Sequence, residues 1–176
     1  MPDNSNSNEK LLRRQKRLAA MLRLVSIVDS TALLAVLMPT LTMAAIHRAI
    51  GLGELPAERI VGYLARSTSL LYAMFGLLML YLSFHVAKFR PVIQFFSGLF
   101  ALCGVVFLGI DICESMPLWW TLGEGPLVCF IGGLIFWLCR QCEAAENEMA
   151  EKEVSTELSG SVRGAGDGKV TSDESI

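Results

Sequence analysis

Four ionisable residues lie inside the long apolar stretches of this 176-residue chain, one in each stretch. They are Asp29, Arg66, Asp111 and Glu124. A charge in the hydrocarbon of a membrane is costly unless it is paired or hydrated, so such residues mark either a functional site or a structural ion pair. Any chemistry that this chain performs is therefore expected to involve these four side chains.

Arg66, Asp111 and Glu124 are predicted to lie at a similar depth, near the outer ends of their helices, where His47 and Glu114 could complete a ring. One interpretation is an outward-facing pocket in which Arg66 binds an anionic headgroup or ligand while the acids hold its geometry. The other, which we favour, is an ion pair between Arg66 and one of the two buried acids that only fixes the register of the helices.

Asp29 and His85 are expected on the inner side of the membrane. Asp29 is predicted one or two turns inside the cytoplasmic end of the first apolar stretch, where a carboxylate could carry protons or sense a cation. A salt bridge at the helix end is the interpretation that we favour. Its candidate partners are Arg23, His85, Lys88 and Arg140.

The residues that could bind a metal or a cofactor form only weak patterns. Cys139 and Cys142 form a CxxC pair to which His85 could add a third zinc ligand, but no second CxxC is present and a reducing cytoplasm disfavours a disulfide. His47 and His85 are predicted on opposite membrane faces, roughly 30 Å apart, which excludes a shared haem iron. The sequence thus predicts no metal, no cofactor and no catalytic set, and does not indicate an enzyme.

Four apolar stretches are long enough to hold the ionisable residues within a membrane. About 20 residues of α-helix cross the hydrocarbon core. The chain is 53% hydrophobic and 18% charged, which is apolar for a soluble protein of this size. The sequence therefore predicts an all-α, integral membrane four-helix bundle. The expected spans are residues 24–46, 62–84, 92–113 and 117–139.

Two of the predicted spans contain features that modify a simple helix. Pro39 lies in the outer half of the first span and is expected to kink it. The fourth span is interrupted by glycine, glutamate and proline at 123–126. Trp119 and Trp120 are expected to mark its outer boundary, because tryptophan side chains favour the headgroup region.

Lysine and arginine predict the orientation, since basic residues accumulate in cytoplasmic segments. The gap between the first two spans balances its charges, and the gap before the fourth holds Glu114 and no basic residue. Both termini are therefore expected in the cytoplasm of a multi-pass inner-membrane protein. A cleaved signal peptide is less favoured, because the first apolar run is too long. The basic residues are Lys10, Arg13, Arg14, Lys16, Arg17 and Arg23 before the first span, and Lys88 and Arg90 after the second.

The two ends of the chain carry opposite charge. Residues 1–23 form a basic segment that is expected to lie on anionic lipid, after about eight disordered residues. Residues 140–176 form an acidic tail in which the fourth helix is expected to continue for a few turns and disorder to begin near Ser159. The leucines expected to face the membrane are Leu11, Leu12, Leu18 and Leu22.

Small residues predict one close helix contact. Gly125, Cys129 and Gly133 are spaced by four and would let another helix approach, either within the bundle or in a homo-oligomer. The sequence does not distinguish these two arrangements. Membrane lipids are the other expected partners, and no surface suited to nucleic acid is predicted.

Three motifs carry a resemblance to a known group of proteins. The segment from Gly51 to Pro56, the run VGYLARS at 61–67 and the run MPLWWTLGEGP at 116–126 resemble an uncharacterised family of small four-span membrane proteins of planctomycete-type bacteria. The resemblance covers about residues 20–140 and implies a four-helix membrane fold without an assigned activity. A more distant similarity, in topology and size alone, is to DoxX-like proteins, some of which are associated with quinone-linked oxidation.

These observations favour a structural or accessory role in the inner membrane. The alternative is a binder or carrier of a lipid, quinone or small anion that uses the outer polar cluster. A small multidrug-type antiporter is a weaker third hypothesis, because the first span lacks the glutamate of such proteins and the charge bias is strong.

Overall fold

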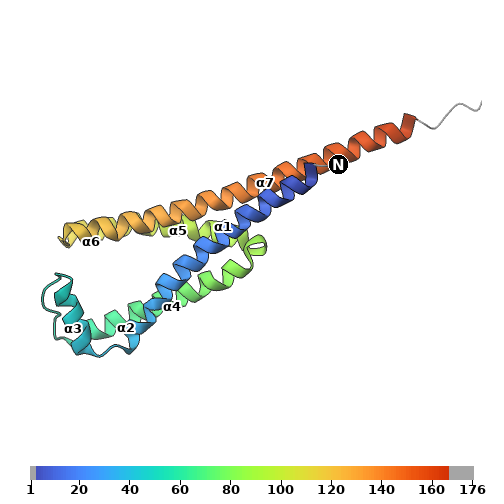
Figure 1. The fold of residues 1–176 in the computed structure, drawn as a ribbon. Helices are drawn as coiled ribbons and strands as arrows, with labels where there is room; N and C mark the ends of the chain where they lie inside the picture. Colours follow the sequence, from blue (N-terminus) through green and yellow to red (C-terminus); the bar gives the residue numbers. More distant parts are fainter. Residues whose placement is uncertain (1–2, 167–176) are drawn as a thin grey trace, which may run out of the picture.

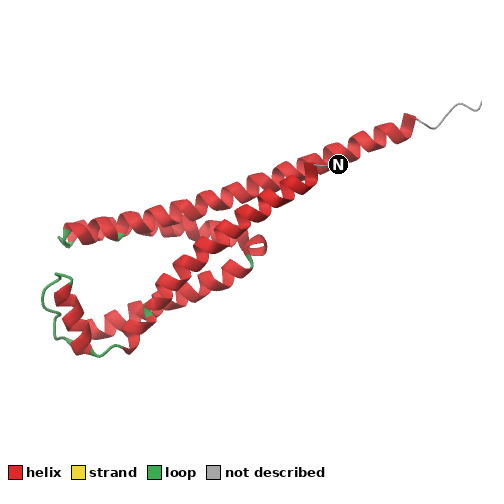
Figure 2. Cartoon of the chain, in the orientation of Figure 1, coloured by secondary structure: helices red, strands yellow, loops and turns green. Residues whose placement is uncertain are grey.

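The structure is a computed structural model that describes residues 3–166. Within these residues the regular elements are all helices and no strand occurs, which confirms the predicted all-α class. Figure 2 shows the helices with the loops that join them. The helices are α1 (Asp3–Thr31), α2 (Leu33–Leu37), α3 (Thr40–Ala49), α4 (Arg59–Phe84), α5 (Val86–Cys113), α6 (Leu118–Gly123) and α7 (Gly125–Gly166).

Four helical segments are long and apolar enough to cross a membrane, which is the predicted number. The first combines α1 with α2, and the fourth combines α6 with most of α7. Because such a helix satisfies its own backbone hydrogen bonds, each segment is suited to a hydrocarbon environment. The four segments are Asn6–Leu37, Arg59–Phe84, Val86–Cys113 and Leu118–Ser155.

Pro39 breaks the first apolar stretch completely, where the sequence predicts a kink. Met38 is extended, with a ψ of 133°, and α3 begins directly after Pro39. Proline has no backbone N–H and its ring collides with the preceding turn, so the helix cannot continue. The stretch 24–46 is therefore not one helix, and the first membrane-length segment is Asn6–Leu37, which takes in most of the basic N-terminal region.

The predicted interruption of the fourth span is only a local irregularity. Glu124 N donates to Trp120 O at 2.8 Å, and Val128 N donates to Glu124 O at 3.0 Å. The hydrogen-bond pattern of the helix thus passes through the glycines. Pro126 is tolerated because it lies in the first turn of α7. Backbone N–H groups in the first turn of a helix make no hydrogen bond within that helix, so the N–H that proline lacks is not needed there.

The ends of the chain are more helical than the sequence predicts. Helix α1 begins at Asp3, and α7 continues to Gly166, past Ser159 where disorder is expected to begin. The segment that follows the fourth span is rich in glutamate, alanine and lysine, which favour helix. Residues 1–2 and 167–176, where part of the predicted disorder falls, lie outside the described residues.

The long helices form two pairs, α1–α2 with α4 and α5 with α7 (Figure 1). The two pairs come together through a contact of α1 with α7, towards the N-terminal end of α1. Helices α4 and α5 are consecutive, yet they have little contact with each other along their length. Figure 1 shows the pairs diverging towards the end that carries α3 and α6.

Polar contacts join three elements at the end opposite α3. The Arg90 guanidinium on α5 donates to the Glu146 carboxylate on α7, with a distance of 2.6 Å from Nη1 to Oε2. Arg14 on α1 donates to the carbonyl oxygen of Gln141 on α7, also at 2.6 Å. The N-terminal region, the α4–α5 turn and the extension of α7 therefore lie at the same end of the molecule.

The most deeply buried side chains lie where α1, α5 and α7 meet. Leu18 and Leu22 are fully buried in this core, so the prediction that they face the membrane is wrong, whereas Leu12 is 54% exposed. The reason is that α7 extends beyond the fourth span and covers one face of α1. The side chains with less than 2% exposure are Leu18, Leu22, Ser26, Ile93, Cys139 and Cys142.

Part of the predicted close-contact surface lies within the chain, between α5 and α7. A Cβ atom added to Gly104 would come within 2.4 Å of Cys129 N, and one added to Gly125 would come within 2.8 Å of Leu108 N. Gly133 has no neighbour within 4 Å of such an atom. Two of the three residues proposed for a homo-oligomer thus contact α5, and Gly133 is the one that stays on the open face.

Gly132 contacts α5 in the place predicted for Gly133. A Cβ atom at Gly132 would lie 2.5 Å from Ala101 N. We therefore expect Gly132→Ala to destabilise the protein by about 1–3 kcal/mol, because the added methyl group overpacks a backbone contact. Thermal unfolding in detergent, followed by circular dichroism, measures this loss.

The neighbouring residue supplies the control. Gly133→Ala should leave the melting temperature unchanged or raise it slightly, because alanine favours helix and has room there. Equal destabilisation by both substitutions would contradict the observed α5–α7 contact.

Candidate functional site

Arg66 donates hydrogen bonds to the corner that Pro39 makes between α2 and α3. Its Nη2 donates to the Met38 carbonyl oxygen at 3.0 Å and to Thr40 Oγ1 at 3.3 Å. Its Nη1 lies 3.4 Å from the Gly62 carbonyl oxygen, one turn earlier on α4. Carbonyl groups at a helix end lack helical partners, and a guanidinium can satisfy them. Arg66 therefore holds the end of the first long helix against α4.

The predicted ion pair of Arg66 is absent among the described residues, since none of their ion pairs joins Arg66 to Asp111 or Glu124. The Glu124 carboxylate instead accepts a hydrogen bond from Trp120 Nε1. This contact lies within one helical turn at the α6–α7 junction. It gives Glu124 a local role where the sequence suggests a link between spans.

The other members of the predicted ring lie apart from it. His47, in α3, has its Nδ1 3.0 Å from the Gly53 carbonyl oxygen in the loop that follows, next to an ion pair of Arg48 with Glu54 at 2.6 Å. Glu114 is exposed at the end of α5. The five residues Arg66, Asp111, Glu124, Glu114 and His47 thus do not form one polar pocket.

Asp111 is buried, with 6% of its surface exposed. It lies seven residues after Gly104 on α5, on the face that contacts α7. Its Oδ2 has no hydrogen-bond partner among the described residues. The sequence correctly selects Asp111 as a residue inside the protein, but its surroundings are the α5–α7 contact and not a basic side chain.

Asp29 also carries a buried Oδ2 that has no partner within the described part of the chain. The four basic residues proposed as partners all make other contacts. Arg23 lies over the Phe84 ring at 4.9 Å, and Lys88 lies over the Phe89 ring at 5.2 Å. His85 Nδ1 is 3.1 Å from the Tyr81 carbonyl oxygen, and Arg140 pairs with Glu143 at 3.4 Å. The favoured helix-end salt bridge is therefore not formed.

The depth of Asp29 explains why those partners are out of reach. Asp29 precedes Leu37, the end of the first long segment, by eight residues, or about 12 Å of helix. On the facing helix, a Cβ atom at Gly76 would lie 2.9 Å from both Ser26 O and Ser30 N. Asp29 therefore lies beside α4 near Gly76, eight residues before Phe84 at the end of that helix.

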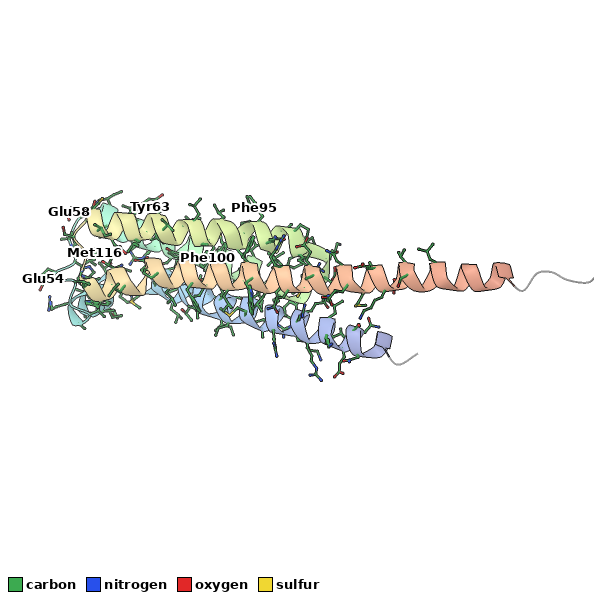
Figure 3. All side chains as sticks on the ribbon, turned by 90° about the horizontal axis from the view of Figure 1, so that it is seen from above. Glu54, Glu58, Tyr63, Phe95, Phe100 and Met116 are labelled. Atoms are coloured by element: carbon green, nitrogen blue, oxygen red, sulfur yellow. The ribbon has the colours of Figure 1, made fainter. Side chains whose placement is uncertain are left out.

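A cavity of about 480 Å³ separates α4 from α5. Its walls are mainly aromatic and aliphatic, with Thr68 and Cys103 as small polar contributors. Phe75 and Phe100 stack in it with ring centroids 5.5 Å apart. In Figure 3, Glu54, Glu58 and Met116 lie at one end of the molecule and Phe100 lies further along the helices. The lining residues are Thr68, Leu71, Tyr72, Phe75, Phe96, Leu99, Phe100, Cys103 and Phe107.

Tyr72 connects the cavity to Asp29. It is at the midpoint of α4, thirteen residues after Arg59 and twelve before Phe84. Its ring lines the cavity, and it precedes Gly76 by one turn on the side of α4 that contacts α1. Tyr72 thus belongs both to the cavity wall and to the part of α4 that contacts α1 near Ser26 and Ser30.

This cavity is not predicted from the sequence. The available signal was the spacing of Phe96, Phe100, Cys103 and Phe107, which places them on one face of a helix. That pattern is equally typical of ordinary core packing. It becomes a cavity only because the facing helix, α4, diverges from α5.

The two inner cysteines are fully buried in the core. No group of three or more potential metal-ligating residues occurs within the described residues, and His85 is directed to the Tyr81 carbonyl oxygen. The cysteines therefore act here as small apolar side chains in the contact between α1 and α7.

Comparison with known protein families, with characterised proteins and with solved structures finds no significant match for this chain. The resemblance to small four-span bacterial proteins and to DoxX-like proteins stays a prediction. Functional inference consequently depends on the geometry of the chain itself.

The contact of Arg66 with Met38 can be tested directly. Arg66→Gln should destabilise the protein by about 1–3 kcal/mol, because it removes a charged donor from the Met38 carbonyl group at the end of the first long segment. Exchange of the charges, Arg66→Asp with Asp111→Arg, should not restore stability. Chemical denaturation in detergent measures both effects.

Arg48→Gln is the matched control, since it removes an exposed arginine that pairs only with a loop glutamate. It should change the stability little. Recovery of stability in the exchanged double variant would instead support the ion pair predicted from the sequence.

Proposed function

We propose that this protein is an integral membrane protein that binds a small, membrane-soluble molecule between α4 and α5. The observation that carries the proposal is the 480 Å³ cavity midway along two membrane-length helices. Its volume and its mainly apolar walls with a few polar groups are typical of ligand sites in proteins. A molecule dissolved in the bilayer would reach it from the side.

The geometry favours an apolar or amphipathic ligand over a small anion. Arg66, the cation on which anion binding would depend, already donates to Met38 and Thr40. The cavity contains no lysine or arginine in its walls. Of the ligand classes suggested by the sequence, a lipid or quinone-like molecule is therefore the better match.

A structural or accessory role is the second candidate. It is supported by two arginines that bind other parts of the chain, Arg66 at the Pro39 corner and Arg90 at Glu146. These contacts stabilise the ends of helices. In this role the cavity would be filled by ordinary acyl chains without selection.

The proposed placement is the inner membrane, with both termini in the cytoplasm. Support comes from the basic residues of α1 and the α4–α5 turn, which lie at the same end as the extension of α7. The loops on either side of α3 and before α6 lie at the opposite end and have few basic residues. This distribution is typical of a cytoplasmic end and an outer end, respectively.

Reporter fusions test this orientation. Green fluorescent protein fused after residue 176 should be fluorescent, and alkaline phosphatase fused after residue 54 should be active, because one reporter folds inside the cell and the other outside it. Phosphatase activity from the fusion after residue 176 would contradict the proposed topology.

Native mass spectrometry of the gently extracted protein tests ligand binding. Wild-type protein should retain a bound small molecule, and Cys103→Phe should lose it, because the larger side chain would project into the cavity and occupy part of the space that the ligand needs. The expected loss of affinity is about tenfold or more, equivalent to at least about 1.4 kcal/mol.

Val105→Phe is the matched control on the same helix. Val105 is 57% exposed and does not line the cavity. This variant should retain the ligand at the wild-type level. Equal occupancy in wild type and Cys103→Phe would contradict binding in the cavity and leave the structural role as the better explanation.

A further inference from the structure

Two acids in the long helices lack a basic partner among the described residues. Asp29 has a buried carboxylate oxygen without a partner among the described residues, and Glu124 contacts only the neutral indole of Trp120 in the bonds that the structure describes. The nearest candidate cations have other roles, with Arg66 at Met38 and Arg23 over Phe84. A buried charge without a partner is unfavourable, so this region is suited to an additional positive charge.

The aromatic walls of the cavity complement a cation in a second way. The faces of aromatic rings carry negative electrostatic potential, and they attract organic cations, above all quaternary ammonium groups. Five of the nine lining residues are aromatic, namely Tyr72, Phe75, Phe96, Phe100 and Phe107. Such walls also accept apolar substituents, which an inorganic cation does not have.

The position of Tyr72 brings the two features together. Its ring belongs to the cavity wall, while α4 contacts α1 one turn away, at Gly76 with Ser26 and Ser30. Asp29 directly precedes Ser30. A cation seated against Tyr72 would therefore be one helical turn from the α1–α4 contact at Ser30, the neighbour of Asp29, and would have aromatic rings around its apolar groups.

We propose that the α4–α5 cavity selects lipophilic organic cations, with Asp29 as the counter-ion and the aromatic walls as the apolar contact. This inference rests on the proposed function, since it names the class of molecule that the same cavity binds. An anion would be repelled by Asp29, and a neutral molecule would leave Asp29 unpaired. A bare metal ion lacks a ligand set within the described residues.

Three probes of similar shape separate the contribution of charge from that of size. The purified full-length protein in nanodiscs of neutral lipid is titrated with tetraphenylphosphonium, with the anion tetraphenylborate and with neutral triphenylphosphine oxide, after subtraction of binding to empty nanodiscs. The cation should bind most tightly and the anion least. Equal binding of the cation and the anion would overturn the proposal without any variant.

Substitutions then locate the charge. Asp29→Asn should weaken tetraphenylphosphonium binding by about thirtyfold or more, as expected when one partner of a buried charge pair is removed, and should change binding of the neutral probe little. Asp29→Glu should keep the preference for the cation. Glu148→Gln, on the exposed part of α7, is the control and should bind as wild type does.

The outcomes distinguish this inference from the proposed function. Unchanged tetraphenylphosphonium affinity in folded Asp29→Asn would overturn the role of Asp29, whereas loss of the neutral probe in Cys103→Phe would still support the cavity as a ligand site. Probe binding that is unaffected by Cys103→Phe would refute the cavity as a ligand site, and with it both proposals. If Asp29→Asn does not fold, the Asp29→Glu variant and the comparison of the three probes decide the question.

Discussion

Pro39 has no backbone N–H, and this missing donor sets the position of the first long helix. The helix ends before Met38, and the carbonyl group left free there is bonded by Arg66 from α4. In a hydrocarbon environment an unsatisfied backbone group is unfavourable, so a break at this depth requires such a donor. Because the helix ends at the corner, its membrane-length part extends back towards the N-terminus, and Asp29 lies beside α4 near Gly76.

Close contact within the two helix pairs explains the space between them. Gly76 brings α4 against α1, and Gly104, Gly125 and Gly132 bring α5 against α7. Backbones that approach closely gain dispersion and polar contacts, which are the main source of helix association in lipid. Because these faces already pack against a partner helix, α4 and α5 meet mainly at their shared turn. The faces of α4 and α5 that diverge form the aromatic cavity. The close packing within each helix pair and the cavity between α4 and α5 therefore have the same cause.

The polar residues within the long helices fall into two groups. Arg66 and Arg90 bind acceptors on other helices, and Glu124 accepts from the indole within its own helical turn, so each satisfies a specific partner. Asp29 and Asp111 each retain a carboxylate oxygen without a partner among the described residues. The first group stabilises the fold. The second group is the better place to look for function, because an uncompensated charge is retained at a cost to stability.

The sequence by itself determined the all-helical class, the number of membrane-length segments, the disruption at Pro39 and the start of the fourth segment near Trp119. These features depend on hydropathy and on backbone chemistry within one segment. Only the tertiary structure decided the partner of Arg66, the surroundings of Asp29, the choice of Gly132 over Gly133 and the cavity. Each depends on the rotation and divergence of helices far apart in the sequence, and a hydropathy pattern along one helix does not specify which neighbour it meets or how closely.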